Sequence, residues 1–345
     1  MDFTQKTGYG LPGQTPEQIL QTERDATARM KAAQPQLCQT RAPKPVVNKV
    51  LMKEVKDLMA ADGLEDGFSF RYLQQAVFGK ELEYIPQSIG SCVASSSMRN
   101  IGDRALAEIT LLDQPEILPG TVIVGKENLL TYGPFSYAAG RTVGGITGGR
   151  PNGMDDGSFV AAHVQGLMSY GALLCSCPDL QAASYPEPKT NREGDAIYRQ
   201  WGSDPTLLNQ FKDSQHRIFL QESDDVNSFD KIREALMAFK PVSVGSALAV
   251  KQESPIEGLS FNGKQAMMAY QDTTDSWQHA MGISGVWKYR GQWYGEVRNQ
   301  WDLFHQNYSQ DFFILPAEFI NSWAKNGTFK TIGELQMKAS EGFAF

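Results

Sequence analysis

The sequence predicts an α+β protein of two packed halves, with the helices first and the strands last. Apolar residues recur at helical spacing from residue 15 to about residue 112, and again around residues 158–170 and 229–239. After residue 278 the apolar segments become short and alternating, with turn residues between them, as expected of antiparallel strands. The length of 345 residues, 41% of them hydrophobic, allows one large or two packed domains.

The first 80 residues predict a helical extension that precedes the main domain. Residues 1–14 are rich in glycine, proline and polar residues and predict a flexible arm. Thr15, Pro16 and Gln18 have the spacing of an N-cap, a first helical position and a capping partner. This helix is expected to end near residue 34, before Pro35. A second helix is expected over residues 47–62, closed by a glycine.

Residues 81–190 predict the helical half. One apolar face runs from Cys92 to Leu112, which indicates a long helix that begins at the cysteine. A glycine-rich segment follows, and a further helix is expected from about Ser158 to Tyr170. Asp155 and Asp156 stand where carboxylates favour the positive end of a helix dipole.

Residues 191–330 predict the β half, and residues 331–345 a C-terminal tail. The chain from 178 to 221 has few periodic signals and is interpreted as connecting structure. A helix over 229–239 leads into the β-branched segment PVSVGSALAV, and strands are expected in HAMGISGVWKY, GQWYGEVRNQW and DFFILP.

Charge and composition exclude several classes of function. The net charge of -7, with no cluster of lysine and arginine, argues against a nucleic-acid partner. No apolar stretch approaches the length of a membrane span, and the N-terminus lacks the apolar core of a secretory signal. Four cysteines in so long a chain do not indicate a secreted disulfide framework, so we expect a cytoplasmic or virion-associated protein.

Three residues far apart in the sequence form a pattern typical of thiol catalysis. Cys92 stands at a predicted helix start, where unpaired N–H groups stabilise a thiolate. His279 begins an apolar strand, and Asn299 ends the next one, where its amide oxygen would fix the imidazole tautomer. Taken singly, Cys92 is as well explained by a buried structural thiol and His279 by a half-buried core histidine. The order Cys, His, Asn is more specific than any one of them.

The motifs around these residues resemble those of the papain-like cysteine peptidases. PQSIGSCVASSS is similar to the nucleophile motif of that family, QHAMGISG to its histidine strand, and VRNQWD to its asparagine motif. ITGGRP resembles the family's glycine-rich loop. Taken together, these motifs follow the family's order, and the resemblance covers roughly residues 80–330. In that loop and before the nucleophile, Ile146 and Ile89 replace a pair of cysteines that the family joins as a disulfide.

The resemblance implies a two-lobed fold and a cysteine endopeptidase that acts on polypeptides through an acyl-enzyme, without cofactor or metal. It implies that Cys92 is the nucleophile, His279 the general base and acid, and Asn299 the residue that orients the histidine. Gln87 and the backbone N–H of Cys92 would form the oxyanion hole.

Four further positions are implied to lie at the substrate cleft. Gly149 would offer backbone hydrogen bonds to an extended substrate, and Pro151 and Ala280 would wall the pocket for the second residue before the scissile bond. Trp301, two residues after Asn299, would shield the histidine–asparagine bond from water. The pair Cys175 and Cys177 is interpreted as ordinary thiols, because a single C-x-C is a weak metal signal.

Two other classes of function stay open. The first is a papain-fold structural or assembly protein, for example of a phage particle, since Val93 and Asp302 depart from the family pattern. The second is an acyl transferase or amidase with the same triad. Residues 1–80 would then be either a removable pro-segment or an arm that docks to a larger assembly, and the absence of a recognisable pro-segment motif favours the arm.

Overall fold

The computed structural model describes residues 14–37, 46–82, 90–114, 131–146, 157–182, 191–204, 206–261, 263–299 and 312–337. The helices are α1 (Pro16–Leu37), α2 (Lys49–Ala61), α3 (Phe70–Phe78), α4 (Cys92–Thr110), α5 (Gly133–Val143), α6 (Val160–Ser169), α7 (Pro178–Ala182), α8 (Asn191–Ser203), α9 (Thr206–Gln210), α10 (Phe229–Met237) and α11 (Ala317–Lys325). The strands are β1 (Asp66–Ser69), β2 (Ala172–Leu173), β3 (Arg217–Leu220), β4 (Val242–Phe261), β5 (Lys264–Tyr289), β6 (Gln292–Arg298), β7 (Phe312–Pro316), β8 (Thr328–Thr331) and β9 (Leu335–Met337). Within these ranges no helix is both long and apolar enough to cross a bilayer.

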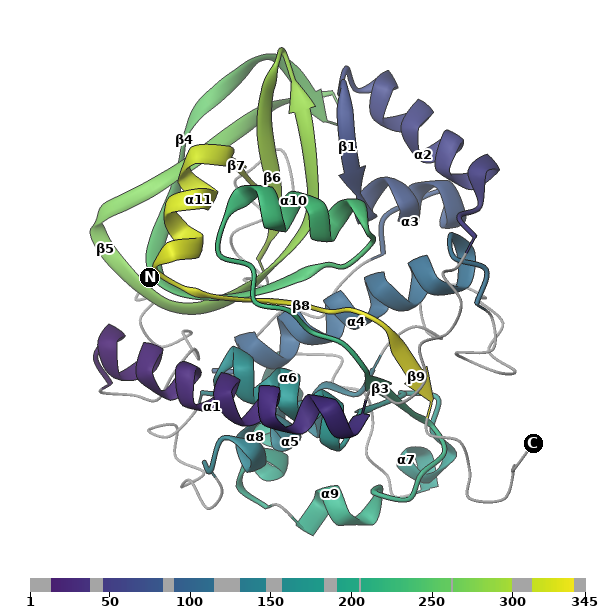
Figure 1. Ribbon diagram of the computed structural model, residues 1–345, viewed down its shortest axis with the longest axis vertical. Helices are drawn as coiled ribbons and strands as arrows, with labels where there is room; N and C mark the ends of the chain where they lie inside the picture. The colour runs from purple at the N-terminus through teal and green to yellow at the C-terminus, as the bar shows by residue number, and fades with distance from the viewer. Residues whose placement is uncertain are drawn as a thin grey trace.

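One large sheet forms the β half, drawn in green in the upper part of Figure 1. Its strand order is β6-β7-β5-β4-β8, and β1 joins it by pairing with β5. The pairs are antiparallel, as expected, except for a short parallel pairing between β5 and β7. The α+β fold class predicted from the sequence is therefore confirmed.

Helix α4 lies between the two halves (Figure 1) and begins, as predicted, at Cys92. Its apolar face, with Ile101, Ala105 and Leu106, is buried in the main hydrophobic core together with residues of the sheet. Asn100 of the same helix donates a hydrogen bond of 2.8 Å to the hydroxyl of Ser243 on β4. These contacts fix the middle of α4 against the sheet.

The helical half is built around α5 and α6, with α8 and α9 packed on α5. Trp201 of α8 packs with Tyr132 and Phe135 beside the start of α5, so residues after 190 share the core of this half. The division of the chain at residues 80, 190 and 330 into separate units stays a prediction. Strand pairings cross each of these three positions, since β1 pairs with β5, β2 with β3, and β9 with β3.

Helix α1 begins with the expected capping box. The backbone N–H of Thr15 donates to the side chain of Gln18 at 2.8 Å, and the N–H of Gln18 donates to the hydroxyl of Thr15 at 3.3 Å. The expected end before Pro35 is wrong, because the helix continues through it to Leu37. A proline inside a helix removes one hydrogen bond without preventing the remaining turns. Figure 1 shows α1 lying along α6 of the helical half.

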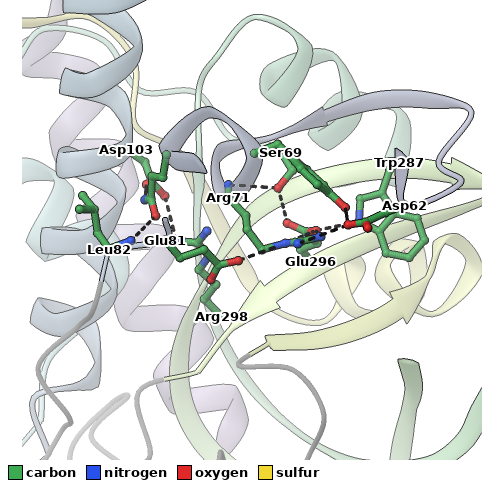
Figure 2. A network of polar contacts seen from close by, with 11 residues as sticks. Asp62, Ser69, Arg71, Glu81, Leu82, Asp103, Trp287, Glu296 and Arg298 are labelled. Atoms are coloured by element: carbon green, nitrogen blue, oxygen red, sulfur yellow. Dashed lines mark hydrogen bonds and ion pairs between the residues drawn. The ribbon is translucent and has the colours of Figure 1, made fainter. Parts of the chain in front are cut away.

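A buried network of charged side chains joins β1 and α3 to β6 (Figure 2). The carboxylate of Glu296, fully buried on β6, accepts hydrogen bonds from Ser69, from Arg71 at 3.2 Å and from the indole of Trp287 at 2.9 Å. Arg71 is 3% exposed and also lies 3.3 Å from Glu81. A buried charge is tolerated only when it is paired and hydrogen-bonded, so this network fixes the register between distant segments.

Candidate active site

Cys92 lies at the seam between the two halves, as the first residue of α4. Its side chain is fully buried, and the backbone N–H of Ala280 on β5 donates to its sulfur at 3.3 Å. The preceding residue, Ser91, makes no side-chain capping bond to the helix. The first turn of α4 therefore directs backbone N–H groups and the positive end of the helix dipole toward the sulfur, which favours the thiolate.

His279 and Asn299 lie next to each other on the β half. His279, on β5, precedes the residue that donates to the sulfur, and Asn299 directly follows β6. The ring nitrogen Nε2 of His279 lies 2.8 Å from Oδ1 of Asn299, and both side chains are buried. The structure thus places His279 beside Asn299, 20 positions later, and places the residue after His279 beside the sulfur of Cys92, 188 positions earlier.

This contact determines which ring nitrogen of His279 holds the hydrogen. An amide oxygen only accepts, so Nε2 must be the donor and Nδ1 retains a lone pair. Burial lowers the pKa of His279 to about 4, against the opposing effect of the hydrogen bond to Asn299. The ring is therefore neutral at pH 7 and able to accept a proton at Nδ1.

A second buried histidine makes the pH dependence of stability measurable. Burial, and then the charge of Arg141, lower the pKa of His163 to about 3. Below pH 6.5 the unfolded chain binds a proton that the folded chain excludes, so this histidine costs about 1.4 kcal/mol of stability per pH unit down to its folded pKa. Burial acts oppositely on Glu108, whose pKa it raises to about 7, so the total slope mixes both signs.

We therefore expect His163→Met to lose less stability on acidification than the unmodified chain. From pH 7 to pH 5 the difference should be about 2 kcal/mol, measured by urea unfolding at each pH. Comparing the two chains cancels the contribution of Glu108. An equal loss in both chains would show that the folded chain protonates His163 as readily as the unfolded one.

Helix α1 packs against the apolar cluster that contains Cys92. Ile19 of α1 is buried in one apolar cluster with residues of α4, α6, β5 and the segments beside α5 and α6, which are Cys92, Val93, Ile146, Phe159, Val160, Ala162 and Ala280. One turn further along, Glu23 is 2% exposed and its carboxylate accepts from the backbone N–H groups of Val160 and Ala161, each at 2.7 Å. Near the other end of the site, the side chain of Gln278 donates to the carbonyl of Gln14 at 3.1 Å.

The remaining predicted site residues divide into two groups. Ala280 is buried beside the sulfur, in the cluster that receives Ile19. Gln87, Gly149, Pro151 and Trp301 lie outside the described residues, as do Asp155 and Asp156. Their implied roles stay predictions.

The segment that leads toward Gln87 is held at its beginning by a buried polar chain. Gln74 of α3 accepts from the N–H of Leu82 at 3.0 Å and donates to Asp103 of α4 at 2.6 Å. Asp103 lies 3.8 Å from Arg298, the residue before Asn299 (Figure 2). Helix α4, the end of β6 and the chain before Gln87 therefore share one set of buried contacts.

Sequence reasoning missed Ile19, Glu23, Phe159 and Val160 at this site. The carboxylate observed at the start of α6 comes from α1, 137 residues earlier, and the expected contribution of the aspartates before α6 stays a prediction. No local signal in the sequence marks that contact. The order of an aliphatic and an acidic residue one turn apart in α1 is too common to identify it.

No protein-family model matches the sequence, and no curated protein sequence matches it at a significant level. Among solved structures the fold is similar to xylellain, a cysteine protease from Xylella fastidiosa, with 14% identity, a TM-score of 0.50 and coverage of 97% of both chains. Digestive procathepsin L 3 of Tenebrio molitor matches at 13% identity and a TM-score of 0.43 over 92% of both chains. Bromelain from Ananas comosus, in complex with the E64 inhibitor, matches at 10% identity and a TM-score of 0.44, over 80% of this chain and all of that one.

The xylellain likeness spans nearly the whole of both chains, N-terminal helices included. In this chain a helix led by a cysteine packs against a sheet that holds a histidine, and an asparagine directly follows a strand of that sheet. The chain therefore has the papain-like cysteine protease fold.

Proposed function

We propose that this protein is a cysteine peptidase that hydrolyses peptide bonds through a Cys92–His279–Asn299 triad. The observation that supports it best is the 2.8 Å contact between His279 and Asn299. The residue after His279, Ala280, donates its backbone N–H to the Cys92 sulfur at 3.3 Å. A structural cysteine does not need a neutral histidine oriented beside it by an amide. The coupled arrangement is what acyl-transfer chemistry needs.

In the proposed reaction Nδ1 of His279 takes the proton of the Cys92 thiol. The sulfur forms a bond to the substrate carbonyl carbon, and the carbonyl π electrons move to the oxygen. The resulting oxyanion is held by the Cys92 backbone N–H and the side chain of Gln87. Collapse of this intermediate breaks the C–N bond, and the amine leaves with the proton from His279.

A water molecule then completes the cycle. It adds to the thioester carbon and gives a proton to His279, and collapse of the second intermediate releases the carboxylic acid product. The Cys92 sulfur leaves as thiolate and recovers the proton from the imidazolium. Asn299 holds the ring in one tautomer through both steps.

The cleft is closed in this form of the chain, because Ile19 packs in the cluster that contains the Cys92 sulfur. Burial lowers the pKa of His279, so the covered imidazole is neutral. Turnover requires α1 to leave, which admits both substrate and water. We therefore propose that residues 1–37 act as a cover, the pro-segment alternative for the N-terminal extension.

Glu23→Gln is expected to speed alkylation of Cys92 by iodoacetamide about tenfold or more at pH 7.5. The substitution removes the charge from two hydrogen bonds that hold α1 in place. Asp25→Asn is the matched control, since Asp25 is an exposed carboxylate of the same helix and accepts a hydrogen bond from Gln21, one turn earlier in α1. Mass spectrometry of the labelled peptides gives the rate at each cysteine. Equal Cys92 rates in the two variants would contradict the cover.

The second candidate is a papain-fold assembly protein without turnover, in which α1 stays in place and residues 1–80 dock to a larger particle. The full burial of Cys92 favours it. In that case Cys92 would label no faster than the half-buried Cys175 even after α1 is loosened. If Cys92 labels fast instead, incubation with peptides, with and without small amines as acyl acceptors, separates a peptidase from an acyl transferase.

A further inference from the structure

The start of α6 holds a carboxylate that does not belong to its own segment of the chain. Both oxygens of Glu23 are used there, one by the N–H of Val160 and the other by the N–H of Ala161, each at 2.7 Å. The Glu23 side chain is 2% exposed and the two donors are fully buried. Two parallel charge-assisted hydrogen bonds to one carboxylate make a geometrically specific anion site.

Helix α6 has no cap of its own at this end. Its N-cap residue is Phe159, which has no side-chain group that could accept a hydrogen bond, and Val160 occupies the first helical position. When α1 leaves, the N–H groups of Val160 and Ala161 therefore need another partner. The open site would hold either water or a second anion.

A buried positive charge adds to the helix dipole here. Arg141 of α5 is 3% exposed and donates to the carbonyl of Gly157 at 2.8 Å, three residues before α6 begins. The positive charge of Arg141 also helps to lower the pKa of His163, one turn into α6. The combined potential favours an anion over water at the start of α6.

The distance between Ile19 and Glu23 along α1 gives the spacing between the apolar cluster at Cys92 and the start of α6. Ile19, four residues before Glu23, packs in the cluster that contains Cys92 and Ala280. Four residues of helix span about 6 Å. An extended peptide covers the same length in about two residues.

We propose that the N-terminus of α6 is a substrate subsite for a carboxylate side chain. The substrate would be a polypeptide with an aliphatic residue near Cys92 and an aspartate or glutamate about two residues away. In the covered form, Ile19 and Glu23 take the places of these two side chains. This inference rests on the proposed peptidase function and names the substrate class.

The test uses the full chain with Ile19→Ser and Glu23→Gln, which removes the apolar side chain and the carboxylate that α1 contributes to this site. Each fluorogenic peptide of the library has one aliphatic residue and one glutamate or glutamine. The position of the glutamate or glutamine relative to the aliphatic residue varies from peptide to peptide. At one position about two residues from the aliphatic residue, the peptide with glutamate is expected to have a kcat/KM about tenfold or more above that of the peptide with glutamine. High salt should reduce this ratio.

Val160→Pro in the same background removes one donor and leaves a residue suited to the first turn. Proline is favoured at the first helical position, and Phe159, at φ -118° and ψ 142°, already has the conformation that precedes a proline. The ratio of glutamate to glutamine rates should fall to less than about threefold. Val160→Ala, which keeps the N–H, should retain the full ratio.

A binding measurement separates this inference from the proposed function. The labelled peptide of residues 14–28 should bind the Ile19→Ser/Glu23→Gln chain about tenfold more tightly than its Glu23→Gln version, and Val160→Pro should remove the difference. If no peptide is cleaved but this difference is seen, the peptidase proposal fails and the carboxylate site stands. Equal binding and equal cleavage of acidic and neutral peptides would overturn the subsite. So would a preference that Val160→Pro leaves unchanged.

Discussion

Cys92→Ala should lower peptide cleavage by about 10⁴-fold or more in the chain released by Ile19→Ser and Glu23→Gln. The sulfur is the atom proposed to bond to the substrate carbonyl, and no other described side chain of the same cluster is a nucleophile. The measurement is kcat/KM on a fluorogenic peptide, with circular dichroism to confirm folding. Cys175→Ala is the matched control, because Cys175 is a half-buried thiol in a different cluster of the helical half.

Cys92→Ser tests whether the reaction needs an ionisable thiol at this position. Serine keeps the shape of the side chain, but its hydroxyl is far less acidic than a thiol and is not ionised by a helix N-terminus and a neutral imidazole. Cleavage should therefore remain close to that of Cys92→Ala. Activity that survives either substitution would show that another group performs the reaction and would end the peptidase proposal for this site.

Arg71→Met is expected to lower the free energy of unfolding by about 3–5 kcal/mol. The guanidinium donates twice to the buried carboxylate of Glu296 and lies over the rings of Tyr72 and Phe261. Removing it leaves the Glu296 charge buried without its main counter-ion. Urea unfolding at pH 7, followed by tryptophan fluorescence, gives the difference in stability.

The control for Arg71 is Arg290→Met. Arg290 also lies over a tyrosine ring and near a glutamate, but its side chain is 59% exposed, so its loss should cost less than about 1 kcal/mol. Adding Glu296→Leu to Arg71→Met should recover part of the loss, because the unpaired charge is gone. A cost for Arg71→Met as small as the control's would mean that water reaches Glu296 once the arginine is removed.

Local signals in the sequence predicted the helix at Cys92 and the strand before Asn299, but the expectation that His279 begins a strand is wrong, because β5 already starts at Lys264. The helix at Cys92 has one continuous apolar face, and the strands around His279 and Asn299 alternate and end at turn residues. The capping box at Thr15 and Gln18 is equally local and was predicted correctly. Each of these depends on residues within a few positions of one another.

The contacts that the sequence did not reveal join distant segments. Arg71 and Glu296 are 225 residues apart, and Glu23 and Val160 are 137 apart. A buried arginine or glutamate has the same local pattern as a solvated one, so its burial cannot be predicted without the fold. The parallel pairing of β5 with β7 is of the same kind, since alternation within a strand does not specify the direction of its neighbour.

The end of the chain restricts how the cleft can open. Strand β8 pairs with β4 in the large sheet, and four residues later β9 pairs with β3 beside the helices, with Leu335 bonded through its N–H to Glu108 of α4. This strap ties the lobes together across their boundary, so a hinge motion that parts them would have to break strand pairing on one side. In the proposed peptidase, substrate would therefore reach Cys92 by displacement of α1 and not by a parting of the two lobes.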